Sequence, residues 1–181
     1  YFVGGSFSFD GGGGGGSGGS SSPPEVQNDI AYRDGLTTTG SQSAVQFDIE
    51  NIGTGFARIE AVTVTARNGI DDEIFNGGPR EIEVTGGDSP GYADTDGNPS
   101  SAAYAADGST IDLDQNGVLS TSAPGSTASV FIGQFGSSQG NNFNQYDFTG
   151  FSRVSESDNW DVRIVLQFQS RGDVSFYFIE T

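Results

Sequence analysis

The stretch DLDQNGVLS carries oxygen-bearing side chains at the spacing of a calcium-binding loop, with a glycine at its sixth position. The candidate metal ligands are Asp112, Asp114, Asn116, the carbonyl of Val118, and Ser120. Ca²⁺ prefers such clusters of hard oxygen ligands. However, Ala123 stands where a bidentate glutamate is expected, and an Asn-Gly hairpin turn also explains Asn116 and Gly117. The sequence therefore predicts either a calcium site or a tight turn here.

The composition excludes most other kinds of catalytic site. The chain has no histidine and no cysteine, and its seven basic residues are all arginines. Without histidine or lysine no serine has a base to activate it, and imidazole and thiolate metal sites are excluded. A carboxylate pair of the glycoside hydrolase kind remains an alternative, but close pairs arise by chance among 24 acidic residues. We therefore expect no enzymatic activity and no cofactor other than calcium.

The formal net charge of −17 restricts both the environment and the partners. In molar salt the Debye length falls to about 3 Å, which screens the repulsion between surface carboxylates. Together with the absence of lysine, the charge favours a protein from a very salty environment. Nucleic acid is not an expected partner, because binding to its phosphates requires a basic patch.

Residues 1–9, YFVGGSFSF, alternate between apolar and small side chains in the manner of a half-buried strand. Its large side chains are Tyr1, Phe2, Val3, Phe7 and Phe9. A single strand cannot bury its apolar face alone and must add to a sheet. The Gly/Ser and proline residues of 11–24 predict a flexible linker, which would reach roughly 40 Å when extended. We expect residues 1–10 to be a donor strand that binds an identical neighbouring subunit.

No run of about 18 apolar residues is present, so no membrane span is expected in the chain. The sequence begins at Tyr1 and not at methionine, which leaves open whether a leader or anchor was removed before it.

Residues 25–181 read as one domain of short strands separated by turn residues. The alternation in 43–51 and in 58–66 predicts a hairpin across residues 52–56. A second hairpin is predicted from 162–168 and 174–180, with its turn at 170–173. Strands at this spacing favour an all-β fold, a single antiparallel β-sandwich of either jelly-roll or immunoglobulin-like topology, with an extended strand before it.

The phrase VQFDIENIGTGFARIEAVTV resembles a segment of secreted β-sandwich surface proteins of halophilic archaea. The order of apolar strand, linker and β-domain is similar to that of donor-strand filament subunits, namely archaeal bundling pilins and TasA-type matrix fibre proteins. The resemblance implies an extracellular, pilus-like filament at the cell surface for adhesion or biofilm formation. The alternative is an anchored ectodomain that binds a ligand and uses the glycine-rich segment as a stalk.

Overall fold

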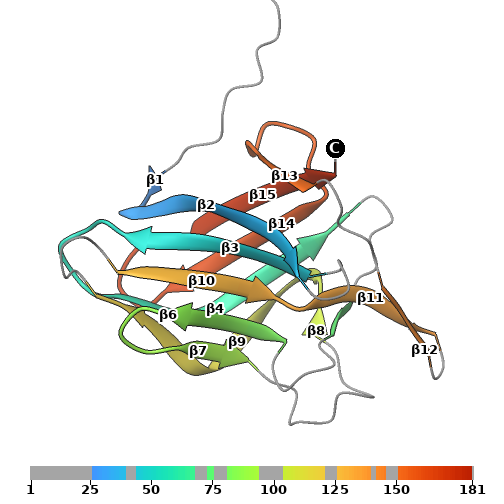
Figure 1. Ribbon diagram of the computed structural model, residues 1–181, viewed down its shortest axis with the longest axis horizontal. Helices are drawn as coiled ribbons and strands as arrows, with labels where there is room; N and C mark the ends of the chain where they lie inside the picture. Colours follow the sequence, from blue (N-terminus) through green and yellow to red (C-terminus); the bar gives the residue numbers. More distant parts are fainter. Residues whose placement is uncertain are drawn as a thin grey trace, which may run out of the picture.

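The protein is an all-β molecule, as the sequence predicts (Figure 1). The structure is a computed structural model that describes residues 26–39, 44–67, 73–75, 81–93, 104–120, 126–139, 142–145 and 151–180. The expected donor strand, residues 1–10, and the expected linker, residues 11–24, lie outside the described residues. The strands are β1 (Val26–Gln27), β2 (Ile30–Thr39), β3 (Ala44–Asn51), β4 (Ala57–Ala66), β5 (Glu73–Phe75), β6 (Ile82–Gly86), β7 (Gly91–Ala93), β8 (Tyr104–Ala105), β9 (Asp107–Leu119), β10 (Thr127–Ile132), β11 (Gln134–Gln139), β12 (Asn142–Gln145), β13 (Phe151–Val154), β14 (Val162–Phe168) and β15 (Val174–Glu180).

Most strands belong to one 11-stranded antiparallel sheet, in the order β1-β2-β3-β10-β6-β7-β9-β4-β14-β15-β13. A smaller, 4-stranded sheet has the order β12-β11-β5-β8. The long strand β9 joins the two halves of the larger sheet, because it pairs with β7 on one side and with β4 on the other. Within the described part of the chain, no helix is long and apolar enough to cross a bilayer.

The larger sheet curls so that its two halves face each other across the hydrophobic core (Figure 1). Phe47 on β3 contacts two aromatic rings of β15, with centroids 4.8 Å from Phe176 and 5.5 Å from Phe178. The period-2 pattern of these strands turns every second side chain inward. One curled sheet thus supplies both layers, whereas the jelly-roll and immunoglobulin-like alternatives assume two sheets packed together.

The two predicted hairpins have different outcomes. The hairpin of 162–168 and 174–180 is confirmed, since β14 pairs with β15. The hairpin of 43–51 and 58–66 is wrong, because β3 pairs with β2 and β10 while β4 pairs with β9 and β14. Residues 52–56 therefore carry the chain from one half of the sheet to the other. Alternation identified the buried faces of both strands correctly, but it does not specify their neighbours.

The crossover at 52–56 is fixed by the side chain of Asn51, which is fully buried at 0% exposure. Its Nδ2 donates to the carbonyl of Gly55 at 2.8 Å. The same amide nitrogen lies 3.2 Å from the carbonyls of both Leu119 and Ser120 at the end of β9. Its Oδ1 accepts the backbone N–H of Gly53 at 3.2 Å, which forms the turn of the Asn-x-Gly motif. One amide thus joins the crossover to β9.

The guanidinium of Arg171, in the turn between β14 and β15, binds the same crossover. Its Nη1 donates to Asn51 Oδ1 at 3.2 Å and to the carbonyl of Asn28 at 3.3 Å. Its Nη2 donates to the carbonyls of Gly55 at 3.0 Å and Phe56 at 3.3 Å. Three segments that are far apart in sequence therefore meet at one side chain.

Replacing Phe47 by alanine is expected to lower the free energy of unfolding by about 3 to 5 kcal/mol, because it leaves a cavity between the two halves. The measurement is chemical unfolding in molar salt. Phe56→Ala is the matched control, because Phe56 is 64% exposed and its truncation should change stability by no more than about 0.5 kcal/mol. Equal effects of the two substitutions would contradict this account of the core.

Replacing Asn51 by alanine is expected to cost about 3 kcal/mol, because it leaves buried carbonyls without a donor. A double-mutant cycle with Arg171→Ala should show a coupling of at least about 1 kcal/mol, since the two side chains share a network. Gln115→Ala, which removes one exposed hydrogen bond to the carbonyl of Pro90, should cost less than either. Additive effects of Asn51→Ala and Arg171→Ala would show that the two residues act separately.

Candidate functional site

The structure places the predicted calcium ligands along a strand and not in a loop. Asp112, Asp114 and Asn116 lie on β9, where both aspartates are exposed. The pairing of β9 with β4 is irregular here, because Ile59 and Ala61 of β4 pair with Gly117 and Asp112, and the ladder shifts register between them. The carbonyl of Val118 accepts the backbone N–H groups of Asp88 at 2.8 Å and Ser89 at 3.3 Å.

Ser120 is buried directly after β9, at 6% exposure. Within the described ranges, no three histidine, cysteine, aspartate or glutamate side chains gather closely enough to hold a metal ion. Calcium binding stays a prediction from the sequence.

The alternative interpretation of Asn116 and Gly117 as a tight turn is wrong, since β9 continues through both residues. Gly117 instead allows a close approach between strands. A Cβ on Gly91 of β7 would lie 2.3 Å from the backbone nitrogen of Gly117, and a Cβ on Gly117 would lie 3.2 Å from Val84. The glycines are therefore explained by packing, which the sequence alone did not reveal.

The predicted donor-strand residues, Tyr1, Phe2, Val3, Phe7 and Phe9, lie outside the described residues. The described fold begins with a hairpin that the sequence analysis missed. Asn28 and Asp29 have φ of 47° and 64°, as a two-residue type I′ turn between β1 and β2 requires. Asparagine and aspartate adopt this conformation more readily than most residues, so the Asn-Asp pair was an available signal.

The two ends of the large sheet come together where it curls, and we call this place the seam. On one side lie β1 and β2, and on the other lie β13 and the first half of β15 (Figure 1). Strand β1 covers β2 only at Ile30 and Ala31. Among the described residues, no strand pairs with this edge of β2 from Tyr32 onward. Within the described residues, the seam thus contains an edge of β2 without a pairing strand, which we call the uncovered edge. On its other side, β2 shifts register against β3 between Arg33 and Thr37.

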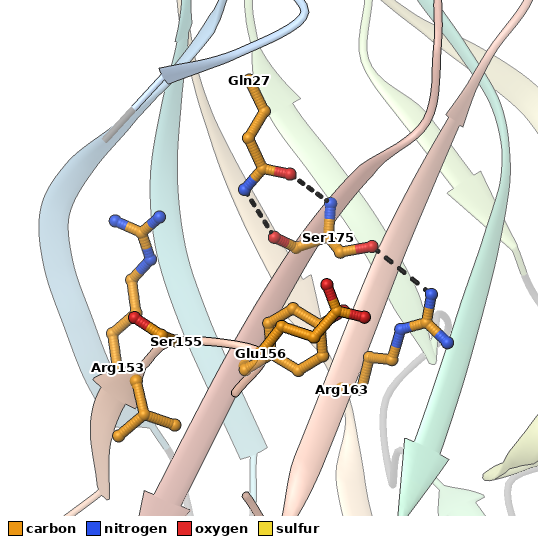
Figure 2. Close-up of a pocket in the computed structure, with 8 residues that line it drawn as sticks. Gln27, Arg153, Ser155, Glu156, Arg163 and Ser175 are labelled. Carbon is orange, nitrogen blue, oxygen red and sulfur yellow. Dashed lines mark hydrogen bonds between the residues drawn. The ribbon is translucent and has the colours of Figure 1, made fainter. Parts of the chain in front are cut away.

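In the part of the chain that the structure describes, side chains and not a β-ladder connect the two sides of the seam. The Gln27 amide donates to the carbonyl of Ser175 at 2.8 Å and accepts the N–H of Ser175 at 3.1 Å, so it imitates a neighbouring strand (Figure 2). Arg153 on β13 places its Cζ 4.1 Å from the ring centroid of Tyr32 on β2. These contacts hold the seam together but leave its strand edge unpaired.

A pocket of about 310 Å³ opens at the Gln27 end of the seam. Its lining residues are Gln27, Arg153, Val154, Ser155, Glu156, Arg163, Ser175 and Tyr177. Figure 2 shows Arg153 and Arg163 on opposite sides, with Glu156 between them. Arg163 Nη2 lies 3.5 Å from Ser175 Oγ, and its Cζ is 5.8 Å from the ring of Tyr177. The pocket therefore combines two guanidinium groups, one carboxylate and several hydroxyl groups.

Burial raises the pKa of the Tyr177 phenol above its ordinary value of 10.0, and its hydrogen bond to the Glu156 carboxylate raises the pKa further. The nearby Arg163 acts in the opposite direction as a smaller effect. The ring of Tyr177 also packs against the ring of Trp160, with centroids 5.5 Å apart. Tyr177 therefore stays protonated in neutral and mildly alkaline solution and can donate to a carboxylate.

No match to this chain emerges from protein-family models, from curated proteins or from solved structures. The seam, with its uncovered edge and its pocket, is therefore the part of the described molecule that bears on function.

The stability of the fold is expected to fall as the pH rises above about 10, partly because of Tyr177. The pKa of Tyr177 is higher in the folded protein than in the unfolded chain. Its contribution to the free energy of unfolding is therefore fully present at a pH below the pKa of the unfolded state, and it is lost as the pH rises through the pKa of the folded state. Tyr177→Phe keeps the ring and removes the proton, so it should flatten this decline relative to the wild type. Thermal unfolding between pH 8 and 11 measures both curves, and parallel curves would contradict the assignment.

Proposed function

We propose that the protein is a structural subunit of an extracellular filament, in which residues 1–10 of one copy add to the uncovered edge of β2 in the next. Backbone N–H and C=O groups on a free strand edge bind an extended segment readily, and natural proteins rarely leave such an edge uncovered. The observation that carries the proposal is this uncovered edge, from Tyr32 onward, in the described fold.

The chain's own sequence supports a partner from another copy. Pro23 and Pro24 stand just before β1, and proline has no N–H to donate to a ladder. The segment that directly precedes β1 is thus poorly suited to extend it along β2. Residues 1–9, in contrast, have an alternating apolar pattern and are separated from the fold by a long Gly/Ser tract.

The expected energy of such a junction is substantial. Val3, Phe7 and Phe9 would each gain about 1.5 to 3 kcal/mol on burial, and ordering of the segment opposes part of this gain. Because the donor and the acceptor are different surfaces, the contact is head-to-tail and propagates into an open fibre. A role in adhesion or biofilm structure follows from a fibre outside the cell.

The strong negative charge supports a setting of high salt, in which subunits of net charge −17 can approach one another.

The second candidate function is that of an anchored ectodomain that binds a ligand. The 310 Å³ pocket favours this candidate, because its volume suits a small molecule. The two candidate functions differ in whether the protein assembles into filaments.

Deleting residues 1–10 is expected to abolish filaments and to leave a folded, soluble chain, because the described core cluster is built from residues between Ile30 and Phe178. Electron microscopy in molar salt measures assembly, and circular dichroism checks the fold. Deleting residues 11–16 instead, which are all glycine, is the control that shortens the linker, retains the strand and should still assemble. Filaments formed by the chain without residues 1–10 would exclude the donor role.

A further inference from the structure

The described residues expose three large apolar side chains, and all three lie at one end of the fold. Val26 on β1 is 47% exposed, while Ile52 and Phe56 on the crossover are 46% and 64% exposed. Single exposed apolar side chains are ordinary in soluble proteins, but several gathered in one place indicate a contact surface. We call these three residues the apolar end.

Hydrogen bonds place the three residues around the type I′ turn between β1 and β2. Strand β1, which carries the first of them, leads directly into this turn. The backbone N–H of Ile52 donates to the carbonyl of Asp29 in the turn at 2.9 Å. Arg171 donates to the carbonyls of both Asn28 and Phe56, each at 3.3 Å. Figure 1 shows β1 and the end of β3, where the crossover begins, at the same end of the larger sheet.

The backbone that carries Ile52 and Phe56 is fixed from beneath. The buried amide of Asn51 donates to the carbonyl of Gly55 at 2.8 Å, and Arg171 donates to that carbonyl at 3.0 Å. A surface whose backbone is already ordered loses little conformational entropy when it binds. The crossover thus presents its exposed side chains in a form that suits docking.

The chain that precedes the described fold indicates which partner lies nearest to the apolar end. It joins the fold at Val26, and in the proposed filament it carries residues 1–10 to the acceptor copy, the copy whose β2 receives them. The predicted linker, residues 11–24, would have a mean span of about 20 Å when relaxed. A domain of this size has a radius of gyration of about 15 Å. The body of the acceptor copy is therefore expected to lie against the end of the fold that contains Val26.

We propose that the apolar end docks against the acceptor copy and forms a second contact between the two copies that the donor strand joins. The inference rests on the proposed function. Three side chains are too few for a stable interface by themselves, since such interfaces bury at least about 1,200 Å². However, a short flexible linker holds the two bodies at an effective concentration in the millimolar range, where a weak contact forms. Burial of apolar surface also remains favourable in molar salt, which screens charges beyond about 3 Å.

The test uses full-length variants and measures the critical concentration for assembly by sedimentation in molar salt. Phe56→Ala should raise the critical concentration about tenfold, a loss typical of the side chains that contribute most to an interface. Phe56→Asp should raise it further, because burial of an unpaired charge is unfavourable. Thermal unfolding below the critical concentration should be unchanged in both variants, because Phe56 is exposed in the described fold.

The matched control is Thr110→Asp. Thr110 is an exposed residue of β9 outside the apolar end, so this variant adds the same charge where no contact is proposed. It should assemble at the wild-type critical concentration. Assembly of both Phe56 variants at that concentration, or an equal rise for Thr110→Asp, would overturn the inference.

A different occupant of the apolar end would be the first strand of the same chain. In that case Phe56→Asp would lower the thermal stability of the full chain but not that of the chain without residues 1–10, and this result would also overturn the inference. If the inference fails while deletion of residues 1–10 still blocks assembly, the donor role stands without this contact. If the deleted chain assembles, both proposals fail.

Discussion

The hydrogen bond between Asn51 and Arg171 is the contact on which the arrangement of the sheet depends. Around it, the crossover at 52–56, the end of β9 and the turn between β14 and β15 are bound to one another. The crossover determines that β3 and β4 belong to opposite halves, and so it makes a single sheet form both layers of the core. Arginine suits this position, because its planar fork can donate to several carbonyls at once, which a lysine ammonium does with less directional precision.

The same network leads to the seam. Arg171 also binds the carbonyl of Asn28, in the type I′ turn that positions β1. With that turn fixed, Gln27 reaches the edge of β15 and imitates a strand there. The sheet is thereby nearly closed, and among the described residues the closure is completed by side chains. The uncovered edge of β2 and the pocket are both consequences of this incomplete closure.

The sequence predicted the parts of the fold that depend on local pattern. Alternation in 162–168 and 174–180, with a turn between them, was sufficient because the two strands are adjacent and pair with each other. It failed for β3 and β4, because alternation shows which side chains are buried but not which strand lies beside them. Gly117 was misread for a similar reason, since its neighbour across the sheet, Gly91, is distant in sequence. The pocket could not be predicted at all, as its residues come from β1, β13, the turn that follows β13, β14 and β15.

The position of the seam has a mechanical consequence. The described fold begins at Val26 in β1 and ends at Glu180 in β15, and these two strands lie on opposite sides of the seam. Tension applied between the two ends of the fold would act first on the Gln27 amide and its neighbours, and only afterwards on the backbone ladders. A few side-chain bonds can break and re-form under load without loss of the core. The molecule would thus extend reversibly at the seam before its core unfolds.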